Sequence, residues 1–298
     1  MIFRITHTTQ YRYSLPVDLC HNEARLRPRD LPTRQRVAHS VTIDPPPAMR
    51  HERTDHFGNS VLYFAVQTEH RALTISAVSE VAATLAPSPV VGASRPWTDA
   101  GALLHEMAAE AALEARQFAL DSPLVTASRE LAAYAAPSFP SGRPLLEAVF
   151  DLTQRIHREF AYDPHVTTVA TALPEMFAAR RGVCQDFAHL AIGCLRALGL
   201  PARYVSGYVE TLAPPGQPRL QGADASHAWF AVFDPDAGWV DFDPTNDQLA
   251  GAHHVTVAWG RDYTDVAPVK GVVLGGGAHQ LEVTVDVLRL PGPPGPPC

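Results

Sequence analysis

The sequence has 298 residues, of which 46% are hydrophobic and 18% are charged. This composition is typical of a globular protein and argues against extensive disorder. The 24 Lys and Arg residues against 31 Asp and Glu residues give a formal net charge of −7. Because no segment carries a dense run of basic residues, we expect no nucleic acid among the partners.

The N-terminus alternates apolar and polar residues over residues 1–14 and lacks the apolar segment of a signal peptide. No window of eighteen or more apolar residues is present, so we expect neither export nor a membrane partner. The cysteines lack CxxC spacing and predict neither a disulfide framework nor a zinc knuckle, which favours a reducing cytoplasm. They are Cys20, Cys184, Cys194 and Cys298.

The first part of the chain, residues 1–90, predicts a domain of antiparallel strands, either a β-sandwich or a barrel. Its expected strands cover residues 2–13, 35–43, 61–67 and 73–81, with Pro and Gly turn signals between them. A segment rich in Pro, Gly and Ser then leads out of this domain at residues 86–97.

Residues 97–140 predict a helical connector, since this stretch is rich in Ala and holds two expected helices at residues 103–120 and 124–136. A third helix is expected at 144–160, where apolar residues recur at helical spacing. A fourth begins at Cys184 and ends at Gly199. Its sequence is more apolar than the others, which predicts a buried helix.

Strands are expected again at residues 202–210, 227–234 and 238–242, so residues 141–250 predict an α+β core. Further alternation at residues 254–259 and 280–290 indicates that residues 251–290 return to pack on the N-terminal domain. The tail at residues 291–298 is rich in Pro and Gly and is expected to be disordered.

A candidate nucleophile lies in the segment RRGVCQDFAHL, where Cys184 opens the apolar helix. The N–H groups and the positive dipole at a helix N-terminus stabilise a thiolate. The Cys184 N–H is also a candidate donor to an oxyanion. The alternative is that Cys184 is a small buried hydrophobic residue.

The partners of this cysteine lie on two expected strands. His227 begins the apolar strand in ASHAWFAVF, and Asp243 ends the strand in GWVDFDPTN. If the two strands form a hairpin, both residues lie near the same end and can touch. A Cys, a His and an Asp then provide a nucleophile, a base and an orienting carboxylate. The alternatives are a structural His and an Asp that forms a turn.

These three segments, in this order, resemble the bacterial members of the transglutaminase-like superfamily, which is related to papain-type cysteine peptidases. The N-terminal segments IFRITHTTQYRY, RLRPRD and DHFGN and the C-terminal segment HHVTVAWGRDYTDVAPVKG resemble the flanking parts of the same proteins. The resemblance implies a papain-like core behind the β-domain, with Cys184, His227 and Asp243 as the catalytic residues. Asp241 competes for the carboxylate role, but the family's aspartate precedes Pro-Thr.

The activity that this resemblance implies is acyl transfer at an amide carbonyl through a thioester acyl-enzyme. Animal transglutaminases have Trp directly after the nucleophile, whereas this chain has Gln185. We therefore expect hydrolysis of a peptide or isopeptide-like bond in a peptide or protein substrate. Transamidation to a primary amine and a non-catalytic interaction module remain the alternatives.

Tyr208 and His254 are candidate binding residues, with docking of the two domains as the other role for His254. Adjacent histidines on a strand point to opposite faces, so the pair His253 and His254 does not predict a zinc site. We expect no metal and no cofactor. Asp186 and His189 are interpreted as structural, and the cationic segment 25–36 as a solvated strand surface.

Overall fold

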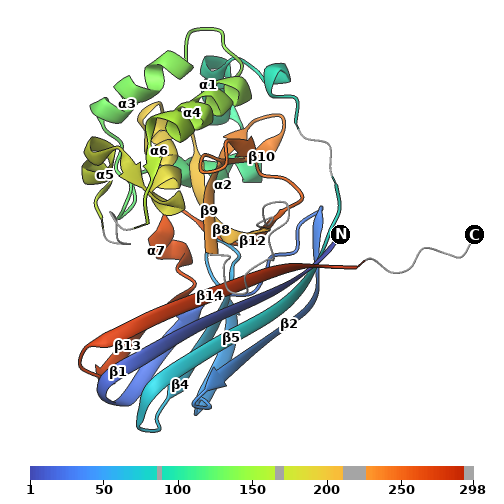
Figure 1. The fold of residues 1–298 in the computed structure, drawn as a ribbon. Helices are drawn as coiled ribbons and strands as arrows, with labels where there is room; N and C mark the ends of the chain where they lie inside the picture. Colours follow the sequence, from blue (N-terminus) through green and yellow to red (C-terminus); the bar gives the residue numbers. More distant parts are fainter. Residues whose placement is uncertain (86–88, 165–170, 211–225, 292–298) are drawn as a thin grey trace, which may run out of the picture.

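The computed structural model describes residues 1–85, 89–164, 171–210 and 226–291. The expected disordered tail, apart from residue 291, and Cys298 lie outside these residues. None of the described helices is both long and apolar enough to cross a membrane. The chain has an elongated N-terminal sheet that carries a helical core at one end (Figure 1).

The N-terminal sheet contains seven strands, and two of them come from the end of the chain. The order is β2-β5-β1-β4-β3, with β13 and β14 also paired to β1. The strands are β1 (Ile2–Ala24), β2 (Arg34–Asp44), β3 (Met49–Thr54), β4 (Ser60–Val66), β5 (His70–Ala83), β13 (Val269–Gly275) and β14 (His279–Leu290).

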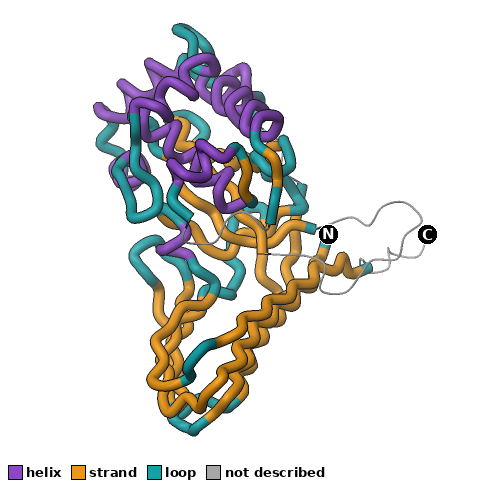
Figure 2. Tube along the Cα trace, turned by 60° about the vertical axis from the view of Figure 1, so that its left-hand side comes forward, coloured by secondary structure: helices purple, strands orange, loops and turns teal. Residues whose placement is uncertain are grey.

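Strand β1 organises this sheet because it has partners along both edges. Its first half pairs with β5 on one side and with β14 on the other, while its second half pairs with β4 and β13. The result is a single curled sheet, which Figure 2 shows as the long strand layer below the core. The expected α+β class is confirmed, with one curled sheet forming the N-terminal part.

The core contains a second antiparallel sheet with the order β11-β10-β9-β8-β12. Helix α6 packs against β9 and β8 in this sheet. Its twelve residues from Gln185 to Arg196 are all buried, as the apolar sequence predicts. The strands are β8 (Ala202–Val209), β9 (Ser226–Asp234), β10 (Gly238–Asp243), β11 (Gln248–Leu249) and β12 (His254–Gly260).

The remaining described elements are helices that pack around this sheet and one small parallel pair of strands, β6 (Ala161–Tyr162) and β7 (Arg181–Gly182). The α-helices are α1 (Trp97–Glu106), α2 (Glu110–Arg116), α3 (Arg129–Ala135), α4 (Leu145–Glu159), α5 (Leu173–Ala179), α6 (Cys184–Ala197) and α7 (Tyr263–Val266). Short 3₁₀ turns are η1 (Val91–Ala93), η2 (Gln117–Ala119) and η3 (Ala136–Ser138).

The helices expected at residues 103–120 and 124–136 differ from those observed. The Arg116 guanidinium donates to the carbonyls of Leu104, His105 and Met107 at 2.7–2.8 Å, so the chain turns between α1 and α2. Ser128 caps α3 through its Oγ, which accepts from Leu131 N at 3.2 Å. Helix propensity alone does not reveal such side-chain bonds to the backbone.

The C-terminal strands also divide differently from the prediction. We expected all of residues 251–290 to pack on the N-terminal domain. Strands β13 and β14 do pair with β1, but β12 pairs with β8 in the core sheet. Alternation identifies a strand and does not identify its partner, because pairing is decided by tertiary packing.

The cationic segment 25–36 is not a uniformly solvated surface. Arg25 and Arg34 are buried, with Arg25 bonded to Asp55 and Arg34 bonded to four carbonyl groups.

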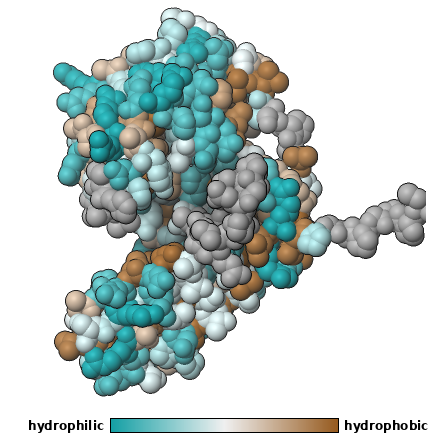
Figure 3. Space-filling view, in the orientation of Figure 1, coloured by the Kyte–Doolittle hydropathy of each residue, from teal (hydrophilic) through white to brown (hydrophobic). Residues whose placement is uncertain are grey.

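Apolar residues of β1, β5 and β14 join the same hydrophobic cluster as the core strands β8 and β12. Apolar patches are visible where the two parts meet (Figure 3). The N-terminal sheet is therefore part of the structure that supports the core.

Candidate active site

Cys184 is the first residue of α6, and the turn before it is held by the helix itself. Asp186 Oδ2 accepts from Val183 N at 2.8 Å. A Cβ atom at Gly182 would lie 2.7 Å from that same oxygen, so this position requires glycine. As the first helical residue, Cys184 has an N–H group with no acceptor inside the helix, which leaves it free for a bound oxyanion.

His227 and Asp243 come together across the hairpin of β9 and β10. Phe242 pairs with Phe230, so Asp243 and Trp229 lie opposite each other on the other face of the sheet. His227, two residues before Trp229, is on that same face and is the diagonal neighbour of Asp243. His227 Nε2 lies 2.8 Å from Asp243 Oδ2. Asp241 is occupied elsewhere, because its Oδ2 accepts from Trp229 Nε1 at 3.0 Å.

Asp243 is fully buried, and its carboxylate is surrounded by hydrogen-bond donors. Oδ2 accepts from Asn246 Nδ2 at 2.7 Å and from His254 Nε2 at 3.0 Å, in addition to His227. Oδ1 accepts from the backbone of Thr245 and Asn246. Burial favours the neutral acid, but the bonds from His227 and His254 outweigh it and hold the pKa of Asp243 well below its usual value.

The imidazole of His227 lies between Asp243 and Cys184. Burial by itself would lower the pKa of His227, but hydrogen bonds to Asp243 and Cys184 more than offset this effect and raise it to about 10. Since Asp243 uses Nε2, the nitrogen left for Cys184 is Nδ1. An imidazolium in this position can donate from Nδ1 to the Cys184 sulfur. Cys184 is half-buried.

His254 donates to the same carboxylate. Gly251 N donates to His254 Nδ1 at 3.2 Å, which places the remaining proton on Nε2, the atom that faces Asp243. The N-terminal sheet fixes this turn, because Arg34 donates to the carbonyl groups of His254 and Gly251. Sequence analysis selected His254 for binding or docking and did not foresee its contact with Asp243.

The cluster of His227, Asp243 and His254 could also hold a metal ion, since their ligand atoms lie within 4.8 Å of one another. Both imidazole Nε2 atoms are directed at Oδ2, so an ion would have to displace both protons and both hydrogen bonds. The donor set is already satisfied internally. This arrangement supports a thiol site rather than a dedicated metal site.

Two other residues singled out in the sequence, Tyr208 and His189, have hydrogen-bond partners outside the Cys184, His227 and Asp243 group. Tyr208 is buried, and its hydroxyl bonds to His7 Nδ1 at 3.0 Å, which joins the core to the N-terminal sheet. His189 Nε2 accepts from Tyr263 N, and burial lowers its pKa to about 4. These contacts fit the structural interpretation of His189.

Sequence analysis missed Tyr162, an exposed residue of β6 that lies near Cys184. Burial and then the charge of Cys184 raise the pKa of its hydroxyl. Its ring contacts Phe187 of α6, and β6 pairs with β7 directly before the Cys184 turn. A two-residue strand leaves no periodic signal in the sequence, so the position of Tyr162 beside Cys184 could be found only in three dimensions.

Two family profiles match the chain. Residues 3–82 match the bacterial transglutaminase-like N-terminal region, and residues 133–244 match the transglutaminase-like superfamily core. The second match contains Cys184, His227 and Asp243.

Several proteins with known sequences are similar to this chain. An uncharacterized protein of Mycobacterium tuberculosis is 43% identical over 97% of this chain and 93% of its own length. An uncharacterized protein of Mycobacterium leprae is 33% identical over 96% of this chain and 98% of its own. A protein-glutamine gamma-glutamyltransferase of Pseudomonas aeruginosa is 38% identical over 98 residues, which are 32% of this chain and 15% of that protein.

The fold resembles a crystal structure from Cytophaga hutchinsonii. The two share a TM-score of 0.74 and 22% sequence identity, over 99% of this chain and 93% of the other. This similarity extends through both the N-terminal sheet and the core.

Proposed function

We propose that this chain, which belongs to the transglutaminase-like superfamily, is a cysteine hydrolase that acts on the amide bond of a peptide or protein. The observation that carries this proposal is the placement of Cys184 at the start of α6 beside the His227–Asp243 pair. Each side chain then has a role that its surroundings support.

In the first step the Cys184 thiolate attacks the amide carbonyl carbon. Charge develops on the carbonyl oxygen, and the free N–H of Cys184 is positioned at the helix start to stabilise it. His227, protonated on Nδ1, gives its proton to the leaving nitrogen. The amine departs and a thioester remains on Cys184. Asp243 keeps the imidazole oriented and stabilises its charged form.

In the second step His227 accepts a proton from water, which attacks the thioester carbonyl. The thioester C–S bond breaks, the carboxylic acid product leaves, and Cys184 returns with its proton shared with His227. Water is the acceptor we favour, because Gln185 stands where animal transglutaminases carry Trp.

Transamidation is the second candidate, and the observation that favours it is the similarity of 98 residues to a glutamyltransferase. The two reactions share the acyl-enzyme and differ only in the acceptor. A primary amine in place of water would produce a new amide bond rather than a carboxylate.

The test is to incubate the protein with a peptide library, with and without a labelled primary amine, and to identify products by mass spectrometry. We expect new carboxylates in both samples and little amine incorporation. Cys184→Ala should lower turnover by at least about 10⁴-fold, because the nucleophile is lost. Cys194→Ala is the matched control, since Cys194 is buried in the core and burial raises its thiol pKa.

Dominant amine incorporation would replace hydrolysis by transamidation and would keep the Cys184 mechanism. Equal activity in Cys184→Ala and in the unmodified protein would overturn the thiol mechanism itself. The Cys194→Ala variant removes one buried sulfur and should lose only about 1–2 kcal/mol of stability.

A further inference from the structure

A pocket of about 1040 Å³ lies between the core sheet and the N-terminal part of the chain. Its walls come from the loops around Arg29 and Phe57, from α2 and η2, and from the face of the core sheet that carries Trp229 and Asp241. Neither Cys184 nor His227 lines it. The pocket is therefore distinct from the Cys184 site, and His254 connects the two, since it lines the pocket and bonds to Asp243.

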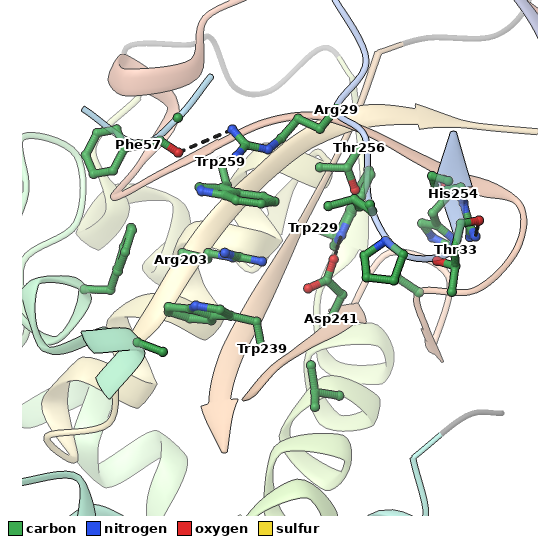
Figure 4. A pocket seen from close by; sticks show the side chains of 18 of the residues that line it. Arg29, Thr33, Phe57, Arg203, Trp229, Trp239, Asp241, His254, Thr256 and Trp259 are labelled. Atoms are coloured by element: carbon green, nitrogen blue, oxygen red, sulfur yellow. Dashed lines mark hydrogen bonds between the residues drawn. The ribbon is translucent and has the colours of Figure 1, made fainter. Parts of the chain in front are cut away.

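Arginine and tryptophan side chains alternate along one wall of this pocket (Figure 4). The guanidinium carbon of Arg29 lies 3.5 Å from the centre of the Trp259 ring. The guanidinium carbon of Arg203 lies 3.9 Å from the Trp259 ring and 4.3 Å from the Trp239 ring. Arg203 is thus held between two indole faces, which fix its plane and leave only the edge of the guanidinium for hydrogen bonding.

That edge has no partner among the described residues. Arg203 is only 7% exposed, and its Nε is a buried donor without an acceptor. The other two arginines of the pocket are engaged: Arg29 donates to Phe57 O and Asn59 Oδ1, and Arg34 donates to four carbonyls. A guanidinium carries five N–H donors, and leaving the buried Nε–H unpaired is costly.

Asp241 faces Arg203 across the pocket (Figure 4). Burial lowers the pKa of Arg203 to about 10, and the charge of Asp241 opposes this shift, so the guanidinium stays protonated at neutral pH. The two groups nevertheless form no ion pair with each other. Within the described part of the chain, Asp241 accepts one bond, from Trp229 to Oδ2, and Oδ1 remains available.

These two groups define the ligand that would satisfy the pocket. A simple anion would pair with Arg203 but would be repelled by the negative charge of Asp241. A simple cation would pair with Asp241 but would be repelled by Arg203. An apolar molecule would leave the N–H edge of Arg203 unpaired. A carboxylate with a hydrogen-bond donor beside it can accept two bonds from the guanidinium and donate to Asp241.

We propose that this pocket is a second binding site, for a small ligand that carries a carboxylate with an adjacent hydrogen-bond donor. Two sources share this chemistry: the C-terminal residue of a peptide, whose amide N–H lies next to the carboxylate, and an acidic sugar, whose hydroxyl does. The volume is sufficient for either. The site does not depend on the proposed acyl transfer.

The test uses tryptophan fluorescence of the full chain carrying Cys184→Ala, so that no probe is consumed. Trp229, Trp239 and Trp259 line the pocket, and Trp97 is the only other tryptophan of the sequence. N-acetyl-L-alanine is the peptide-type probe and its primary amide is its uncharged control. D-glucuronate is the sugar-type probe, with D-glucose as its control.

We expect saturable binding of at least one carboxylate and weaker binding of its uncharged control. Arg203→Met keeps a long apolar side chain between the two indoles and should weaken binding about tenfold or more. Asp241→Asn leaves the Arg203 stack in place and should also weaken binding, which provides a second variant if Arg203→Met does not fold. Arg155→Met is the matched control, because Arg155 packs on Tyr134 outside the pocket.

Saturable binding of only one carboxylate supports the site and identifies the source of its ligand. If no carboxylate binds, or if binding is unaffected in the folded Arg203 and Asp241 variants, the proposed site is wrong. Equal binding of N-acetyl-L-alanine and its amide would overturn the role of the carboxylate. Because Cys184 is absent throughout, none of these results bears on the catalytic proposal.

Discussion

On one face of the core sheet, the end that carries Asp243 and the end that carries Asp241 place an aspartate in opposite hydrogen-bonding environments. At one end Asp243 is fully buried and accepts from two histidines, one asparagine side chain and two backbone N–H groups. At the other end Asp241, two residues earlier on β10, accepts a single bond from Trp229. Both carboxylates contact β9 at the same diagonal offset.

The difference shows that position on a strand does not decide what a carboxylate does. Asp243 is internally satisfied and is thereby locked in place, which suits a residue that must orient an imidazole. Asp241 and Arg203 retain free hydrogen-bonding capacity beside a pocket, which suits recognition of an external group. One end of the face is arranged for internal order and the other for binding.

The largest expected effect is at the ordered end. Asp243→Asn should lower turnover by about 10³- to 10⁴-fold, because an amide cannot stabilise the imidazolium and favours the wrong tautomer of His227. Asp234→Asn is the matched control, since Asp234 is also buried and accepts backbone bonds at the far end of the same hairpin. Steady-state rates and circular dichroism of both variants check this expectation. Unchanged turnover in Asp243→Asn would remove Asp243 from the mechanism.

A smaller effect on turnover is expected for His254, which bonds to Asp243 and also lines the pocket. His254→Ala removes one donor from Asp243 and should lower kcat by about 10- to 100-fold with little change in KM, because His254 acts through Asp243 as a positioning residue. His254→Gln can still donate an N–H and should recover part of the rate. The pH dependence of Cys184 alkylation by iodoacetamide should move in the Ala variant and less in the Gln variant. Identical profiles in all three proteins would leave His254 with a structural role alone.

A third expected effect concerns stability and not the rate of turnover. The folded-state pKa of His227 is raised from 6.5 to about 10, so its contribution to stability is fully present below about pH 6.5 and is lost as the pH rises towards 10. The difference in unfolding free energy between the unmodified protein and His227→Gln should therefore shrink over this range, by at most about 1.4 kcal/mol per pH unit.

Urea unfolding at several pH values measures this difference. In a Cys184→Ala background one of the groups that raise the pKa of His227 is missing, so the loss should be complete at a lower pH. A difference that stays constant across the range would contradict the raised pKa.

The elements that the sequence predicted well have strong local signals. Helix α6 begins at Cys184 because Gly182 precedes it and an apolar run follows, and the hairpin of β9 and β10 follows from short alternating strands around one turn. His227 and Asp243 could be placed together by counting residues from that turn. The alternative interpretation of Asp243 as a turn-forming residue also holds, since its Oδ1 accepts from two backbone N–H groups.

The features that escaped prediction depend on contacts between distant residues. The long helix expected at residues 103–120 is divided by Arg116, whose bonds to three carbonyls cannot be read from helix propensity. Tyr208 meets His7 across about 200 positions of sequence. The Arg203 stack joins side chains from three strands with Arg29 of the N-terminal part. Neither period-two alternation nor helical spacing encodes such contacts.

The pairing of β1 with β14 has a consequence for the order in which the protein forms. Strand β1 leaves the ribosome before its partner strands, and β5 can pair with one of its edges once residue 83 has been made. The other edge stays open until β13 and β14 are synthesised, after the whole core. An open edge invites pairing with other chains. We therefore expect truncation before residue 269 to produce aggregation rather than an isolated, soluble core.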